Sequence, residues 1–514
     1  MRGWDLRIEL DARSSLPLFL QIARAVADGV RCGRLRPGEP LPGSRTLAAT
    51  LRIHRNTALA AYRELEAEGW ITTSAARGTF VSSALPERRP RPFAPLPSRE
   101  GTPVRPGFEL RPTSLPKGYL PPKGALSLAS GAPDPRLFPS AALARAYRRA
   151  LRLHARTLLD YGDPGGLPRL REALSAMLRS VRGLACSAET VQLTRGSQMA
   201  LDLTARALLQ PGDAVAVEAL GYRMAWEAFR SAGARLIPVP VDAEGLDVAF
   251  LERAAEREKI RAVYVTPHHQ YPTTVVLSPG RRLRLLELAR RKRFAILEDD
   301  YDHEFHYEGR PVLPLASADR DGSVVYLGTL SKILAPALRM GFVVAPPPLI
   351  ERLAHLRMFA DRQGDNLLEY AVAELLEDGE VQRHARRVRK LYQQRRDALC
   401  GALRRRLPGA VSFQVPSGGS ALWLQVADGI DAGEWTARCL DQGVDIKPCW
   451  SFAFDDRPQP FFRLGFATHS PQELEDAVKR MAAAMPRPHP RRLRAAAPQA
   501  PAPGGRRGAA RAYG

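Results

Sequence analysis

The first 83 residues show a hydrophobic pattern that predicts three helices followed by a β-hairpin. Over residues 17–31, apolar side chains recur three or four positions apart, the spacing of one helix face. These positions are Leu20, Ala23, Val26, Ala27 and Val30. SRTLAATL predicts a short second helix with Ser44 as its N-cap. After a tight turn, HRNTALAAYRELEAEG predicts a third helix. Its apolar face is expected at Leu59, Ala60 and Leu65. After Gly69, WITTSAARGTFVS alternates β-prone residues around a turn containing glycine, as a hairpin does.

Residues 126–485 follow a second pattern, in which short apolar runs alternate with helical segments. The apolar runs are AVAVEAL, RAVYVTP, FAILEDD, SVVYLGTL and MGFVVAP, and AWEAFRSAG and RRLRLLELARRKR are two of the helical segments. This alternation predicts an α/β domain around a mostly parallel sheet. Ligands in such folds collect at the carboxyl ends of the strands, where the chemically active residues are expected.

The chain is long enough for more than one domain, because single cores stop growing at about 250–300 residues and this chain has 514. Residues 84–125 are rich in proline and arginine and lack periodicity, which predicts an extended linker. Residues 486–514 are rich in Ala, Pro, Arg and Gly, which predicts a disordered basic tail. We therefore expect a small domain at 14–83 and a larger one at 126–485.

The formal net charge of +22 points to a polyanionic partner or an acidic ligand. Residues 1–83 hold 12 basic and 8 acidic side chains, and the last 29 residues hold 7 basic and none acidic. The excess is therefore not confined to one domain, and charge alone does not choose between these partners. The sequence has no stretch of about 18 uncharged apolar residues, and charges interrupt its opening where a signal peptide needs an apolar segment. A cytoplasmic protein is expected.

The cysteines and two adjacent histidines do not predict a metal site. The five cysteines are Cys32, Cys186, Cys400, Cys439 and Cys449. They lack CxxC spacing, and we expect reduced residues that pack in the interior. No third ligand lies at a suitable spacing from His268 and His269, so metal ligation by this pair is not expected either.

Lys332 is the strongest candidate for chemistry, because the chain has only eight lysines among 76 basic residues. It follows a predicted strand in SVVYLGTLSKILAPALRMGF. A desolvated lysine can lose its proton and condense with an aldehyde, which arginine cannot do. Thr329, Ser331 and Arg339 are suited to hold a phosphate dianion beside it. This arrangement suits a Schiff-base lysine.

Other motifs supply groups that suit pyridoxal phosphate. In FAILEDDYDHEF, Asp299 is the first choice to pair with a pyridinium nitrogen, with Asp300 as the nearest rival, and Tyr301 could hydrogen-bond the phenolic oxygen. Tyr222 lies just past a strand, where it could stack on an aromatic ring. Gly196, Ser197 and Gln198 begin a predicted helix, whose free N–H groups favour phosphate. His269 and Gln270 follow another strand, within reach of such a cofactor.

The small domain carries candidate contacts to DNA. A helix-turn-helix places the first residues of its second helix at base edges. Here these residues are His54, Arg55, Asn56 and Thr57. Arginine and asparagine suit bidentate contacts to guanine and adenine. Arg45 and Arg77 are better suited to phosphates or the minor groove, and Ser44 and Gly78 beside them complete the set.

The small domain resembles the GntR family of winged helix-turn-helix regulators. The matching segments are PLFLQI, GRLRPGEPLPGSRTLAATL, HRNTALAAYRELEAEGWI and RGTFV. His54 stands where the family usually has serine as helix N-cap. This difference is expected to weaken the cap by about 1 kcal/mol or to alter base preference.

The larger domain resembles fold-type-I aminotransferases, which implies a large α/β domain with a smaller C-terminal α+β subdomain. The matching segments, in order, are YGDPGGLPRLREAL, TRGSQMALDL, EALGYRMAW, VYVTPHHQYPT, ILEDDYDHEF, YLGTLSKILAPALRMGF and FFRLGFA. The resemblance implies Lys332 as the internal aldimine, Asp299 at the ring nitrogen, Tyr301 at the phenolic oxygen and Tyr222 stacked on the ring. It also implies Ser197, Ser331 and Arg339 around the phosphate. Arg463 would clamp a substrate carboxylate.

Together the two parts resemble the MocR subfamily of regulators, which implies a head-to-tail homodimer that binds double-stranded DNA. Leu220, Thr274 and His268 depart from the usual residues, where a proline-like residue, glycine and a small residue are expected. These departures leave cofactor binding intact and bear on the choice of ligand.

Two functions remain open at this point. One is a regulator that senses pyridoxal phosphate, or its aldimine with an amine or amino acid such as γ-aminobutyrate or taurine. The alternative is an active pyridoxal-phosphate-dependent aminotransferase with an appended DNA-binding domain, with Lys332 as the general base. A DNA-bound structural protein with an empty pocket is a third interpretation.

Overall fold

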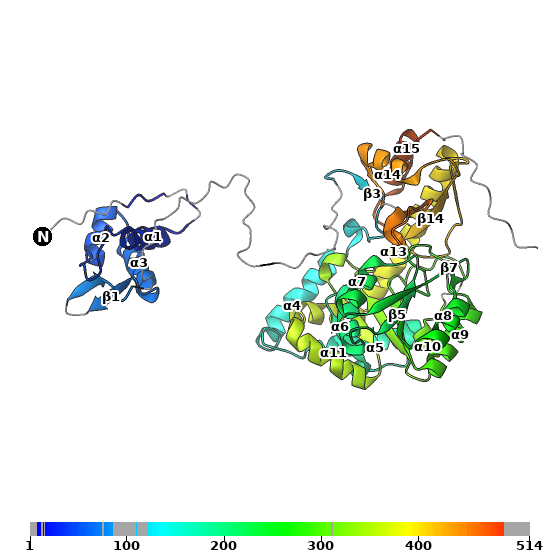
Figure 1. The fold of residues 1–514 in the computed structure, drawn as a ribbon, viewed down its shortest axis with the longest axis horizontal. Helices are drawn as coiled ribbons and strands as arrows, with labels where there is room; N and C mark the ends of the chain where they lie inside the picture. Colours follow the sequence, from blue (N-terminus) through cyan, green and yellow to red (C-terminus); the bar gives the residue numbers. More distant parts are fainter. Residues whose placement is uncertain are drawn as a thin grey trace, which may run out of the picture. The chain divides into compact units, whose positions relative to one another are not determined.

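The computed structural model describes residues 8–11, 14, 16–74, 77–85, 109, 122–309, 312–447 and 449–487 (Figure 1). The chain divides into two compact units, residues 1–117 and 118–514, and each is described by itself. Most of the predicted linker, and the predicted tail from residue 488 onward, lie outside the described residues. Within the described residues, every helix is too short or too polar to cross a membrane.

The N-terminal unit contains three helices and a two-stranded antiparallel hairpin, in the predicted order (Figure 1, blue). These elements are α1 (Leu18–Arg31), α2 (Ser44–Leu51), α3 (Arg55–Ala67), β1 (Ile71–Ser74) and β2 (Gly78–Val81). Ile22, Val26 and Leu47 are fully buried and pack in one core with Leu65 from α3. Of the positions predicted for the core side of α1, Ala23, Val26, Ala27 and Val30 are buried and Leu20 is only partly buried. The buried Ile22 was not predicted.

Two local predictions for this unit are wrong in detail. Ser44 is the first residue of α2 and Gly43 is the N-cap, without a side-chain cap hydrogen bond. The buried face of α3 consists of Ala58, Ala61, Tyr62 and Leu65, whereas Leu59 and Ala60 are only partly buried. The large Tyr62 takes part in the core because its hydroxyl donates to the carbonyl oxygen of Pro42 at 2.5 Å, which satisfies its polar end.

The larger unit is built around a seven-stranded sheet with the order β4-β12-β11-β10-β9-β5-β6. The strands are β4 (Val191–Thr194), β5 (Ala214–Glu218), β6 (Arg235–Val239), β9 (Ile260–Val265), β10 (Ala295–Asp300), β11 (Val324–Thr329) and β12 (Gly341–Val344). Strand β12 is antiparallel to both of its neighbours, and the other strand pairs are parallel. A mostly parallel sheet was predicted from the alternation of apolar runs and helical segments.

Helices cover both faces of this sheet, because its strands are apolar on both sides. On β5, Val215 and Val217 belong to one core cluster, and Ala214 and Ala216 belong to another. The helices of this part are α4 (Ser140–Leu158), α5 (Pro168–Arg182), α6 (Ser197–Leu208), α7 (Arg223–Ser231), α8 (Val248–Arg257), α9 (Pro279–Lys292), α10 (Leu315–Ala318), α11 (Pro347–Ala360) and α12 (Asn366–Glu377). A short hairpin is formed by β7 (Val241–Asp242) and β8 (Gly245–Leu246).

The last part of the larger unit is a smaller α+β subdomain, as expected. Its antiparallel sheet consists of β13 (Val411–Phe413), β14 (Ala421–Val426) and β16 (Phe461–Gly465). Its helices are α13 (Glu380–Arg406), α14 (Ala432–Asp441) and α15 (Pro471–Ala483). Strand β15 (Val444–Asp445) pairs in parallel with β3 (Leu126–Ser127), which ties the start of the unit to this subdomain.

The cysteines are only partly as expected. Cys186, Cys400 and Cys439 are free and buried, where they pack as small apolar side chains. Cys32 is free but exposed at the C-cap of α1, so the prediction that it packs in the interior is wrong.

Candidate functional site

In the N-terminal unit, the start of α3 presents the predicted base-contacting residues to solvent. His54, Arg55 and Asn56 are exposed and Thr57 is partly buried. His54 is the N-cap, and its Nδ1 accepts a hydrogen bond from the backbone N–H of Asn56 at 3.2 Å. Histidine therefore does cap this helix in place of serine. Because the cap holds the His54 ring, Arg55 and Asn56 are the side chains best able to extend toward a base edge.

The other predicted DNA contacts are also at the surface of this unit. Arg45 is exposed in the first turn of α2, and Ser44 beside it is partly buried. Arg77 and Gly78 are exposed at the turn of the β1–β2 hairpin. Gly78 has a φ of +102°, a conformation that favours glycine and allows the tight turn.

In the larger unit, Lys332 lies three residues beyond the carboxyl end of β11. Its side chain is half-buried, and its Nζ donates to the carbonyl oxygen of Gly131 at 3.3 Å. Burial lowers the pKa of this amine to about 8, and the positive charge of Arg463 lowers it further, against the opposing effect of Asp302 and Asp299. Near neutral pH, a useful fraction of the amine is therefore unprotonated and nucleophilic.

Asp299 and Asp300, the two alternatives for the ring nitrogen, lie on opposite faces of β10, since consecutive strand residues alternate. Asp299 accepts a hydrogen bond from the hydroxyl of Tyr264 at 2.8 Å. Burial raises its pKa to about 7, so a cation would stabilise its charged form. Asp300 accepts from the Tyr326 hydroxyl at 2.8 Å and lies 3.0 Å from Nδ1 of His303. Because Asp299 is the one that affects the pKa of Lys332, the geometry favours Asp299 over its rival.

Three tyrosines of the larger unit form an aromatic cluster. The rings of Tyr222 and Tyr271 meet edge to face with centroids 5.4 Å apart, and Tyr271 and Tyr301 do so at 6.2 Å. The Tyr301 hydroxyl donates to the carbonyl oxygen of His269 at 3.0 Å. Both predicted tyrosines are thus brought together, and Tyr271 lies between them.

Gly196 and Arg339, two of the predicted phosphate ligands, meet at the start of α6. Gly196 is the N-cap with a φ of +78°, and a side chain there would come within 3.1 Å of the Arg339 guanidinium. Ser331 Oγ is buried and lacks a hydrogen-bond partner among the described residues. A helix N-terminus, a guanidinium and an unsatisfied hydroxyl together suit a phosphate dianion. Ser197 is the first residue of this helix and shares the location.

Three of the predicted phosphate ligands have protein partners. Arg339 Nη2 donates to the carbonyl oxygen of Arg195 at 2.8 Å. The Thr329 hydroxyl donates to the carbonyl oxygen of Met340 at 3.1 Å, and it accepts from the backbone N–H of Ser331. The Gln198 amide donates to the carbonyl oxygen of Met224 at 3.1 Å. These hydrogen bonds hold the loop after β11 and the first turn of α6 in place. Thr329 and Gln198 therefore position the phosphate ligands and are less suited to donate to the phosphate themselves.

Arg463 lies on β16 of the smaller subdomain, and its side chain lies beside Tyr271. It is buried, and its guanidinium carbon lies 4.7 Å from the centre of the Tyr271 ring. Its Nε lacks a hydrogen-bond partner in the described part of the chain. A buried guanidinium with unused donors suits a ligand carboxylate.

Three further residues at this site were missed at the level of sequence. Tyr271 and Asp302 lie inside motifs that were recognised, VYVTPHHQYPT and ILEDDYDHEF. Lys447 Nζ lies 3.5 Å from the Tyr271 hydroxyl and 5.0 Å from the centre of the Phe452 ring. Its rarity among arginines was a usable signal, because the same argument singled out Lys332.

The fold adds a third histidine to the adjacent pair His268 and His269. Sequence spacing shows no third ligand for His268 and His269, but the fold places His306 within reach of both. His268 also lies within 4.8 Å of ligand atoms of Asp300 and His303. His303 and His306 lie in the loop after the neighbouring strand β10, so their spacing along the chain does not indicate that they are possible ligands.

Two protein families match this chain in the expected order. The bacterial regulatory proteins of the gntR family match residues 18–81, and the class I and II aminotransferases match residues 123–481. The second match covers most of the larger unit. The predicted combination of a winged helix-turn-helix with an aminotransferase fold is therefore confirmed.

Relatives with both parts are regulators. The chain is 30% identical over 479 residues to the probable rhizopine catabolism regulatory protein MocR of Rhizobium meliloti, which covers 92% of this chain and 95% of that protein. It is 32% identical to the HTH-type transcriptional regulator TauR of Rhodobacter capsulatus, which covers 90% of this chain and 96% of that protein.

Solved structures similar to this chain include aminotransferases. The α-aminoadipate aminotransferase LysN of Thermus thermophilus matches with a TM-score of 0.66 at 33% identity, covering 70% of this chain and 92% of that chain. A multiple substrate aminotransferase from Thermococcus profundus matches with a TM-score of 0.66 at 32% identity, covering 71% of this chain and 91% of that chain. From its two matched parts and its full-length relatives, the chain belongs to the MocR subfamily of GntR-type transcription regulators.

Proposed function

We propose that this regulator binds pyridoxal 5'-phosphate through Lys332 and that the bound cofactor, alone or with an amine or amino acid, changes its affinity for DNA. The observation that carries the proposal is the place of Lys332, next to the unpartnered Ser331 hydroxyl and just after β11, which pairs with the strand that carries Asp299. Burial also lowers the pKa of Lys332 to about 8. A surface lysine keeps a pKa near 10.4 and is a poor nucleophile at neutral pH.

The residues present fit this cofactor at each of its polar groups. Gly196, Ser197, Ser331 and Arg339 would hold the phosphate, and the unsatisfied Ser331 hydroxyl is the clearest sign of a missing partner. Asp299 would keep the ring nitrogen protonated. Tyr301 would hydrogen-bond the phenolic oxygen once its hydroxyl turns away from the His269 carbonyl, and Tyr222 would stack on the ring. The cofactor, when bound, supplies an aldehyde that an amine can capture and a ring that withdraws electrons.

The effector site extends from Lys332 toward the smaller subdomain. Arg463 has unused donors beside Tyr271, so it would clamp the carboxylate of an amino acid effector. The similar LysN structure is a complex with N-(5'-phosphopyridoxyl)-L-leucine. This ligand combines a phosphopyridoxyl group and an amino acid in one molecule. An amino acid or related amine is therefore the effector class that the site suits, alongside pyridoxal phosphate itself.

The response to an effector requires two DNA-binding units that can change their arrangement. We propose a head-to-tail homodimer with residues 14–83 as the DNA reader, 84–125 as the linker and 126–485 as the sensor. A coupling free energy of about 1–3 kcal/mol between the two sites would change DNA affinity about 5–150-fold.

The test measures DNA binding and cofactor binding on the same protein. The full chain is titrated with duplex from its own upstream region and with a scrambled duplex, with and without pyridoxal phosphate, and binding is followed by fluorescence anisotropy. We expect the cofactor to change affinity for the upstream duplex about 5–150-fold. Lys332→Ala should keep its affinity without cofactor and lose the response.

Lys390→Ala, at an exposed lysine on α13, is the matched control and should respond like the wild type. Equal affinity for both duplexes under all conditions would contradict the proposal. Robust multiple turnover of amino acids with 2-oxo acids would favour the aminotransferase alternative, whereas slow half-reactions alone would support the sensor.

A further inference from the structure

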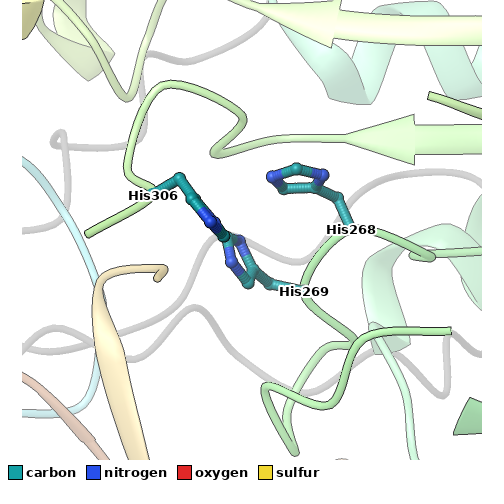
Figure 2. A group of neighbouring side chains, drawn as sticks. All are labelled: His268, His269 and His306. Carbon is teal, nitrogen blue, oxygen red and sulfur yellow. The ribbon is translucent and has the colours of Figure 1, made fainter. Parts of the chain in front are cut away.

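Four histidines gather behind the cofactor site, at the carboxyl ends of two adjacent parallel strands. His268 and His269 follow β9, and His303 and His306 follow β10. The His268 ring centre lies 4.5 Å from that of His269, 4.7 Å from that of His303 and 6.4 Å from that of His306. Figure 2 shows His268 and His269 on one loop and His306 on a second loop, with the three rings near one another.

Their polar atoms are buried and largely unused. His268 is 3% exposed and His269 is 2% exposed. Both ring nitrogens of His268, and Nε2 of His269, lack hydrogen-bond partners among the described residues. A buried polar atom without a partner costs about 1–3 kcal/mol. Three such nitrogens close together indicate that a ligand binds between these rings.

The chemistry of these rings suits a metal cation. His269 Nδ1 lies 2.8 Å from Oδ1 of Asp302, which is the arrangement in which a carboxylate holds the Nδ1 proton and leaves Nε2 free to bind. Buried histidines that ligate metals in proteins use this same carboxylate support.

The spacing is close to that of a zinc site. In each of His268, His269 and His306, one ring nitrogen lies within 4.8 Å of a ring nitrogen of the other two. A tetrahedral zinc ion with bonds of about 2.0–2.1 Å holds its nitrogen ligands about 3.4 Å apart. Small rotations of the side chains would close this difference.

We propose that His268, His269 and His306 bind a Zn²⁺-type divalent cation, with Asp302 orienting His269. Three protein ligands leave the fourth position of a tetrahedral ion open for water. His306 is the least buried of the three residues, and both of its ring nitrogens are buried without a hydrogen-bond partner among the described residues. Gly418 packs against His269 Nε2, where a side chain would collide with the ring, so only glycine fits at this position.

In a second group, made of His268, Asp300 and His303, the possible ligand atoms also lie within 4.8 Å of one another. It is the weaker ligand set, because Asp300 already accepts from the Tyr326 hydroxyl and pairs with His303 Nδ1. The two sets share His268 but differ in His306 and His303. Substitution of these two residues therefore distinguishes them.

The ion would also be linked to the proposed cofactor site through His269 and Asp302. The carbonyl oxygen of His269 accepts the Tyr301 hydroxyl, and the Asp302 carboxylate affects the pKa of Lys332. The metal site nevertheless stands on its own contacts and does not require the proposed function to be correct.

The experiment uses the full chain after removal of metal with a chelator and dialysis. Zn²⁺ binding is measured by calorimetry and by metal analysis after gel filtration, and Co²⁺ replaces Zn²⁺ to report coordination geometry through its visible absorption. His306→Gln is the main variant, since this partly exposed residue tolerates substitution best. His355→Gln, at an exposed histidine on α11, is the matched control.

We expect one tightly bound ion in the wild type and in His355→Gln, with a tetrahedral Co²⁺ spectrum. Asp302→Asn should weaken binding about 10–100-fold, and His306→Gln should weaken it further. His303→Gln should leave affinity unchanged. Melting curves establish that each variant is folded.

Three results would overturn the assignment. Loss of the ion in His303→Gln but not in His306→Gln would assign it to the other set. Equal binding by all variants would show that it binds elsewhere in the chain. The absence of any ion that survives gel filtration would leave these rings to bind water only.

Discussion

The two units of this protein carry their functional side chains in opposite ways. In the N-terminal unit, Arg55 and Asn56 are exposed and lie next to each other at the start of one helix. In the larger unit, Asp299 and Arg463 are buried and come from strands of two different sheets. The first arrangement suits an extended partner that approaches from outside, and the second suits a small ligand enclosed on several sides.

This difference determines which physical effects matter in each unit. Exposed cations on the N-terminal unit act in water and are screened by salt. Buried groups in the larger unit act in a lower dielectric, and their pKa values shift as a result. Tests of the larger unit should therefore change pKa values and ligand affinity, while tests of the N-terminal unit should change salt dependence and base preference.

The largest effect is expected at the phosphate ligands. Arg339→Ala removes charge-assisted hydrogen bonds worth about 1.5–3 kcal/mol, so pyridoxal phosphate should bind about 10–150-fold more weakly. Equilibrium titration of the visible absorption of the bound cofactor measures this. Arg320→Ala, at an exposed arginine, should leave the affinity unchanged. Equal affinity in both variants would remove Arg339 from the phosphate site.

A base-reading residue in the N-terminal unit should lose selectivity as well as affinity. Asn56→Ala should weaken specific DNA binding by about 1–3 kcal/mol and relax the preference at one base pair. Arg45→Ala should instead weaken binding to all sequences and reduce the slope of affinity against salt by about 1. Competition among duplexes at several salt concentrations compares the two variants. Identical behaviour of both would mean that the start of α3 does not read bases.

The lowered pKa of Lys332 sets the pH range for cofactor capture. The neutral amine predominates above about pH 8, so the rate of capture should rise toward that pH and then level off. Burial is the main cause of the lowered pKa and the charge of Arg463 is the next, so Arg463→Met should move the midpoint to higher pH. Stopped-flow absorbance measures the rate, with N-acetyl-lysine as a reference for the cofactor's own titration. An unchanged midpoint in this variant would contradict the role of Arg463.

The same shift affects stability in a defined direction. Because the folded-state pKa of Lys332 lies below its ordinary value of 10.5, the unfolded chain binds the proton more tightly. The contribution of this group to the free energy of unfolding therefore rises as the pH increases from about 8 to 10.5.

The smallest effect is expected at Thr274, where the sequence departs from the usual glycine. Thr274 has a φ of +65°, which is unfavourable for a β-branched residue. Thr274→Gly should raise the free energy of unfolding by about 1 kcal/mol, after the flexibility of glycine in the unfolded chain is taken into account. Thr273→Gly is the control and should lower it, because the Thr273 hydroxyl donates to Gln270 Oε1 at 2.6 Å. Denaturant titration of the larger unit measures both, and equal shifts would show that the left-handed backbone is not strained.

Prediction from the sequence was most successful for elements and motifs that are formed by residues close together in the chain. The order of the helices and the hairpin in residues 18–81 follows from periodicity and turn residues, since each element forms within its own segment. The same holds for the motif around Lys332, which contains the lysine, Ser331 and Arg339 within nine residues. The N-cap of α2 was misplaced by one residue, because local propensity does not separate Gly43 from Ser44.

The sequence by itself determined the two-part organisation, the α/β fold and the segments that carry the chemistry, because these depend on periodicity and on residue type. Only the tertiary structure decided which side chains meet. It separated Asp299 from Asp300 across the sheet, inserted Tyr271 between Tyr222 and Tyr301, and brought His306 to His268 and His269. The physical reason is that parallel strands end at one edge of the sheet, so loops distant in the chain converge there.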